Sequence, residues 1–83
     1  MRPQDILKYL QRTPFQPFRL CLSDGRSFEI RHPEMAMVGR SAVIIGVPDP
    51  EEEEPIYERS FDCAIMHIAS LEPIDGRSPR KKR

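Results

Sequence analysis

Two cysteines and two histidines, namely Cys21, His32, Cys63 and His67, have the side chains best suited to metal binding or nucleophilic catalysis. Thiolates and imidazoles are the usual ligands of structural zinc, where they occur as two closely spaced pairs. Only Cys63 and His67, with three residues between them, have such a spacing here. A disulfide between the two cysteines would be unusual in a reducing compartment. We therefore predict no metal, no cofactor and two free thiols.

The length and glycine content of the chain favour a binding protein over an enzyme. With 83 residues, it is long enough for one domain with a small core. A nucleophile with its base and orienting group requires a pocket that such a core can hardly enclose. The four glycines are scattered and form no phosphate-binding loop. The absence of a long apolar run and of a signal peptide predicts a cytoplasmic protein without membrane contacts.

The net charge of zero conceals three blocks of different charge. Residues 1–48 have seven basic and four acidic side chains, residues 49–75 have nine acidic and one basic, and residues 76–83 have five basic. Glu51 to Glu54 belong to an acidic loop predicted at residues 48–55, which could bind a basic partner or simply be solvated. The basic residues 75–83, rich in polar side chains, are predicted to form a disordered tail.

Cations at several positions are candidates for contact with nucleic acid. Basic side chains attract phosphates without sequence specificity, whereas a histidine ring can stack on a base or form hydrogen bonds with it. His67 could instead be a structural strand residue. The predicted nucleic-acid contacts are His67, Arg19, Arg26, Arg31, Arg40, Arg80, Lys81, Lys82 and Arg83.

The elements that must position these residues begin with a helix over about residues 3–12, with Pro3 at its first turn and apolar residues on one face. Strands are predicted over about residues 18–72. Apolar and polar residues alternate on both sides of Asp24-Gly25, which indicates a hairpin and places Arg19 and Arg31 on its polar face. Pro33 interrupts the second strand, because proline has no N–H for sheet pairing.

Further β-prone runs at residues 35–38, 42–47, 56–63 and 65–71 complete the pattern. Over the whole pattern, including the hairpin, we count about five strands, some of them strongly bent. A sheet of this length should curl into a small closed barrel to cover its apolar faces, with the helix over one end. The predicted fold is therefore mainly β, with a short N-terminal α-helix and a five-stranded antiparallel barrel forming one domain over residues 1–74.

The order of a helix and five strands resembles the Sm-like proteins, whose barrel is SH3-like, and two stretches support this. Residues 18–28, with Asp24-Gly25-Arg26 at the turn, resemble the start of the first Sm motif. Residues 65–73 resemble the last strand of the Hfq RNA chaperones, with His67 in place of the histidine of their Lys-His pair. The resemblance implies an RNA-binding homo-oligomer, with a ring as the expected form.

Three short motifs also resemble an uncharacterised family of short bacterial proteins. They are Pro-Phe-Gln-Pro-Phe at residues 14–18, Asp-Gly-Arg at 24–26 and His-Pro-Glu at 32–34. This second resemblance implies no particular chemistry. From the residues and the Sm resemblance we predict a non-enzymatic, oligomeric module that binds RNA or another nucleic acid. The alternatives are a protein-interaction or scaffold module, with the acidic loop as a contact, and a small regulatory subunit of a larger complex.

Overall fold

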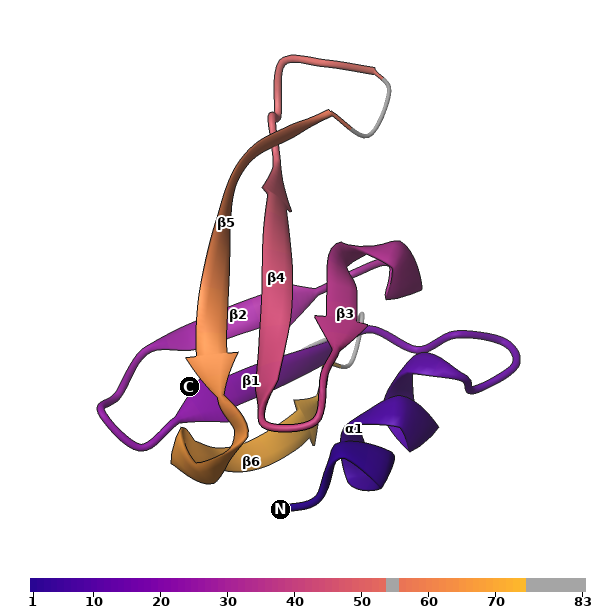
Figure 1. The fold of residues 1–83 in the computed structure, drawn as a ribbon. Coiled ribbons are helices and arrows are strands. Elements are labelled where there is room, and N and C mark those ends of the chain that lie inside the picture. Colours follow the sequence, from indigo (N-terminus) through magenta and orange to yellow (C-terminus); the bar gives the residue numbers. More distant parts are fainter. Residues whose placement is uncertain (54–55, 75–83) are drawn as a thin grey trace, which may run out of the picture.

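The computed structural model describes residues 1–53 and 56–74 and contains one short α-helix and two three-stranded sheets (Figure 1). Two short 3₁₀ turns, η1 and η2, connect strands of different sheets. The elements are α1 (Pro3–Leu10), β1 (Phe18–Leu22), β2 (Ser27–Ile30), η1 (Pro33–Met35), β3 (Ala36–Val38), β4 (Ala42–Pro48), β5 (Tyr57–Ala64), η2 (Ile65–His67) and β6 (Ile68–Pro73).

Helix α1 begins at Pro3, as the sequence predicts, because proline fits the first helical turn. The backbone N–H of Arg2 donates to a carboxylate oxygen of Asp5 at 2.9 Å, which closes the first turn. The helix ends at Leu10, two residues before the predicted end. Ile6 is its fully buried residue and anchors the helix on the core.

The first sheet has the strand order β2-β1-β6, and all its pairs are antiparallel. Phe18, Leu20 and Leu22 of the central strand β1 are buried, in agreement with their alternation in the sequence. The predicted hairpin is present, and residues 23–26 connect β1 to β2. Gly25 has a φ of 96°, a conformation that residues with a Cβ rarely adopt.

The second sheet has the order β3-β4-β5 and is also antiparallel. Val43 and Ile45 of β4 are fully buried, whereas Ile44 between them faces outward. At Gly46 an added Cβ would lie 2.9 Å from a ring carbon of Tyr57. The tyrosine ring therefore packs directly on the glycine backbone of the neighbouring strand.

The prediction of a closed, five-stranded barrel is wrong in two respects, although the mainly β fold with an N-terminal helix is confirmed. The described residues form six strands instead of five, because the 3₁₀ turn that begins at Pro33 separates β2 from β3. These two strands belong to different sheets. Among the described residues the sheets stay open: β2 and β6 are the edges of one, and β3 and β5 are the edges of the other.

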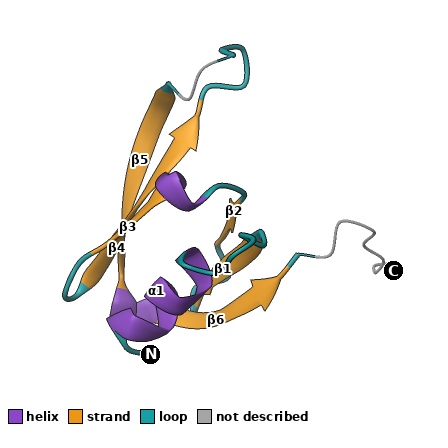
Figure 2. Ribbon diagram, turned by 90° about the vertical axis from the view of Figure 1, so that its right-hand side faces the viewer, coloured by secondary structure: helices purple, strands orange, loops and turns teal. Residues whose placement is uncertain are grey.

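The core lies between the two sheets, and α1 lies at one end of the space between them (Figure 2). Phe18 is 1% exposed and contacts Tyr9 and Phe15 edge-on, with ring centroids 5.1 and 6.2 Å away. No helix within residues 1–53 and 56–74 has the length and apolar character needed to cross a membrane. The buried side chains are Ile6, Phe18, Leu20, Leu22, Ile30, Met35, Val43, Ile45, Cys63, Ile65 and Ile68.

Candidate functional site

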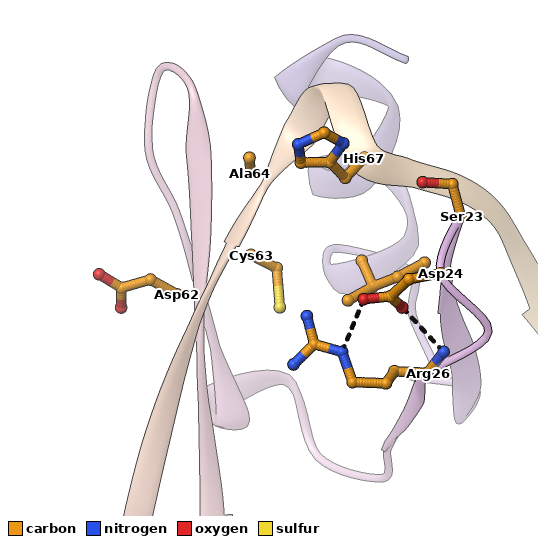
Figure 3. A pocket seen from close by; sticks show the side chains of 8 residues that line it. Ser23, Asp24, Arg26, Asp62, Cys63, Ala64 and His67 are labelled. Carbon is orange, nitrogen blue, oxygen red and sulfur yellow. Dashed lines mark hydrogen bonds and ion pairs between the residues drawn. The ribbon is translucent and has the colours of Figure 1, made fainter.

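A pocket of about 450 Å³ lies where the β1–β2 loop meets the end of β5 and the turn η2 (Figure 3). It contains Arg26 and His67, which are two of the predicted nucleic-acid contacts and lie far apart in the sequence. One hydrogen bond joins their elements: the backbone N–H of Ser23 donates to the carbonyl of His67 at 2.8 Å. The lining residues are Leu22, Ser23, Asp24, Arg26, Asp62, Cys63, Ala64 and His67.

Arg26 is held in the pocket by Asp24, two residues before it in the turn. The backbone N–H and the Nε of Arg26 donate to the two carboxylate oxygens of Asp24, at 3.0 and 2.9 Å. The first of these bonds is the main reason why the pKa of Asp24 is below its ordinary value. The two terminal nitrogens of the Arg26 guanidinium have no protein partner among the described residues, so they can donate to a ligand.

His67 lies on the opposite side of the pocket from the Arg26 guanidinium (Figure 3). It is the last residue of η2, and its side chain is exposed. The prediction that His67 lies on the final strand is therefore wrong, because β6 begins one residue later. An exposed ring beside a cavity can stack on an unpaired base.

Cys63 also lines the pocket, and in the view of Figure 3 it lies between His67 and Arg26. It is only 4% exposed, and this burial raises the pKa of its thiol. A raised pKa keeps the sulfur protonated near neutral pH, and the protonated thiol is a poor nucleophile. Cys21 and Cys63 are both free thiols. The groups around the cavity are therefore suited to hydrogen bonding and stacking.

Arg19 and Arg31 lie on the outward face of the first hairpin, as predicted, but each is paired with an acidic residue. Both guanidinium groups contact the Glu29 carboxylate, at 3.2 Å from Arg19 and 2.9 Å from Arg31. Arg19 also lies 4.0 Å from Glu72 on β6. This face is thus close to neutral and does not form the basic patch that the arginines alone suggested.

The ion pairs of Glu29 with Arg19 and Arg31 should make the free energy of unfolding fall at acid pH. The hydrogen bond from Arg19 is the largest cause of the lowered pKa of Glu29, and the hydrogen bond from Arg31 is the next. The contribution of Glu29 to the free energy of unfolding is therefore present above about pH 4.5 and is lost as the pH falls below that value. Because the ion pairs are exposed, we expect the loss to be at most about 1 kcal/mol. Urea unfolding at neutral and acid pH should show a smaller loss for Glu29→Gln than for the wild type. Glu34→Gln should behave like the wild type; equal losses for all three proteins would contradict this role of Glu29.

The remaining predicted cations lie apart from the pocket or outside the described residues. Arg40 is exposed in the turn between β3 and β4 and does not line the pocket. Arg80, Lys81, Lys82 and Arg83, with the rest of the predicted tail 75–83, lie outside the described residues. Of the nine predicted contacts, Arg26 and His67 are therefore the two that line the first pocket.

A second pocket, of about 310 Å³, lies beside the acidic loop. Carboxylates from η1 and from residues 49–53 surround it, and the Tyr57 hydroxyl donates to the backbone carbonyl of Glu34 at 3.4 Å. Residues 54–55 of the predicted loop lie outside the described residues. The lining residues are His32, Glu34, Met35, Pro48, Asp49, Glu52, Glu53 and Tyr57.

Several side chains of the first pocket were missing from the predicted contacts. Asp24 was assigned only to the turn, and Cys63 was considered only for metal binding, a disulfide or nucleophilic catalysis. Ser23 and Asp62 gave no signal, because a serine in a turn and an aspartate on a strand are common on any surface. The Asp-Gly-Arg turn itself could have indicated the pair, since a turn aspartate often bonds the backbone two residues later.

The part of the chain that the structure describes contains no group of three or more His, Cys, Asp or Glu side chains suited to a metal ion. Comparisons of the chain with protein-family models, with curated protein sequences and with solved structures give no match. The likeness to Sm-like proteins therefore stays a prediction from the sequence. The first pocket itself provides the evidence for a functional proposal.

Proposed function

We propose that this protein is a non-enzymatic, cytoplasmic module that binds single-stranded RNA, with one nucleotide in the pocket between Arg26 and His67. The position of these two side chains is the observation that supports the proposal. Arg26 offers free guanidinium donors, which suit a phosphate or a base oxygen. His67 offers an exposed ring, and sequence-specific RNA recognition relies on stacking of unpaired bases on such rings. The Sm-like motifs in the sequence point to the same class of ligand.

The charge of the described residues suggests how RNA binding is divided along the chain. Eight basic and eleven acidic side chains lie within residues 1–53 and 56–74, so this part cannot attract a nucleic acid by charge alone. The base in the pocket should therefore provide much of the affinity of the described part. The sequence of the last four residues, Arg-Lys-Lys-Arg, adds non-specific attraction to phosphates.

Titration of the full chain with a labelled RNA tests this function. We expect the single strand to bind and the duplex of the same sequence to bind much more weakly, because a paired base cannot enter the pocket. Binding should weaken as salt is raised but should not disappear, because stacking on His67 is less salt-sensitive than phosphate contacts. Absence of single-strand binding at low salt, or equal affinity for the duplex, would exclude the proposal.

Protein interaction is the second candidate, because strand β5 has a free edge. It pairs with β4 on one side and with no other strand among the described residues. A free edge can pair with a strand of a partner protein or of another copy of this chain. The predicted homo-oligomer, including a ring, would use such an edge. The mass of the protein in solution tests this: a monomer at micromolar concentration would exclude the oligomer.

A further inference from the structure

The Asp24–Arg26 pair presents hydrogen-bond donors and acceptors to the pocket in a fixed order. Both Asp24 oxygens already accept one hydrogen bond from Arg26, and each has a further lone pair. The terminal nitrogens of Arg26 are donors without a protein partner in the described residues. The Arg26 donors thus lie beside the two Asp24 acceptors, and the two hydrogen bonds between these residues hold both side chains in place.

The four RNA bases differ in what their Watson–Crick edges present to such a set of groups. Guanine has a carbonyl oxygen followed by two N–H donors. Its oxygen can therefore accept from Arg26 while its two N–H groups donate to the two oxygens of Asp24. Uracil alternates acceptor, donor and acceptor, cytosine places its one donor beside two acceptors, and adenine has one donor and one acceptor. Each of these three bases would leave an Asp24 oxygen opposite an acceptor or without a partner.

The charge and size of the pocket also fit a neutral base. The carboxylate of Asp24 balances the guanidinium of Arg26, and the carboxylate of Asp62, the other acidic residue of the lining, points away from this pair (Figure 3). The pKa of Asp24 is lowered by its bonds with Arg26, which keeps this residue an acceptor at neutral pH. The cavity of about 450 Å³ lies within the usual range of ligand sites, about 300–1,000 Å³. His67 is on its opposite side and can stack on the base.

We infer that the pocket selects guanine, with Asp24 accepting the two N–H groups of the base edge and Arg26 donating to its carbonyl oxygen. This inference rests on the proposed binding of single-stranded RNA. Asp24 would then be the residue that determines specificity, and His67 would contribute affinity for any base.

Short single-stranded RNAs that differ at one central base test the inference on the full chain. We expect the guanine RNA to bind about tenfold or more tightly than the adenine, cytosine and uracil RNAs, which is typical of a bidentate base contact. An inosine RNA should have intermediate affinity, because inosine keeps the carbonyl and one N–H of guanine and lacks the amino group.

The variant Asp24→Asn replaces one acceptor oxygen with a donor and keeps the other for the Arg26 backbone. It should lose the guanine preference, so that the guanine and uracil RNAs bind the variant with equal affinity. Asp49→Asn, the same change in the acidic loop, should retain the preference. Equal affinity of the wild type for all five RNAs, or a guanine preference that survives Asp24→Asn, would overturn the inference while the RNA-binding proposal stands. Absence of binding to every RNA would overturn both.

Discussion

Replacement of Phe18 by alanine is expected to destabilise the protein by about 3–5 kcal/mol, the usual range for a buried phenylalanine. Phe18 is 1% exposed and is the largest fully buried side chain. It lies on the central strand of the first sheet and contacts Tyr9 of α1 and Phe15 of the connector. The shorter side chain would leave a cavity between helix and sheet and remove both ring contacts.

A loss of this size is a large part of the total stability, which for 83 residues amounts to about 4–12 kcal/mol. Thermal unfolding should show a midpoint at least about 12 °C below that of the wild type. Met37→Ala, at a position that is 67% exposed, should change the free energy of unfolding by less than about 0.5 kcal/mol. Equal stability of the two variants would contradict a major contribution of Phe18 to the packing of the core.

Replacement of His67 by alanine should weaken the binding of single-stranded RNA by about 1–3 kcal/mol, the effect of removing one stacking side chain. This corresponds to a loss of affinity of about 5- to 150-fold. The side chain is exposed, and its main structural bond is made by its backbone carbonyl, which alanine retains. The free energy of unfolding should therefore change by less than about 0.5 kcal/mol.

His32→Ala is the matched control for this variant. His32 is the other histidine of the chain, and it is also exposed. It lines the second pocket, beside the acidic loop, and not the first pocket. Its replacement should leave both RNA affinity and stability unchanged. If His67→Ala instead lowered stability and kept full affinity, His67 would have the structural role considered as its alternative from the sequence.

Much of the fold follows from local patterns in the sequence. Alternation around Asp24-Gly25 predicts the first hairpin, and Pro33, which the sequence marks as an interruption, begins the turn η1 after β2. The prediction of a closed barrel was wrong, because closure depends on which strand edges pair with each other. Apolar alternation shows which face of a strand is buried, but it says nothing about the partner of an edge.

The pocket was less predictable than the fold. Arg26 and His67 meet because β6 pairs with β1 and because one backbone hydrogen bond ties η2 to the hairpin loop. Neither contact has a signal in residue types. The neutral face at Glu29 could have been anticipated, since Arg19 lies opposite Glu29 in the antiparallel register. The sequence alternation placed the arginines on the correct face without identifying their partners.

The central claim is that single-stranded RNA binds between Arg26 and His67, and its location can be measured directly. Backbone amide chemical shifts of the full chain should be recorded during titration with a guanine-containing single strand. We expect the largest shift changes at residues 22–26 and 62–67, which contain the lining of the pocket. Unchanged shifts at these residues, with changes confined to the acidic loop at 49–53 or to the face with Arg19 and Arg31, would contradict the claim.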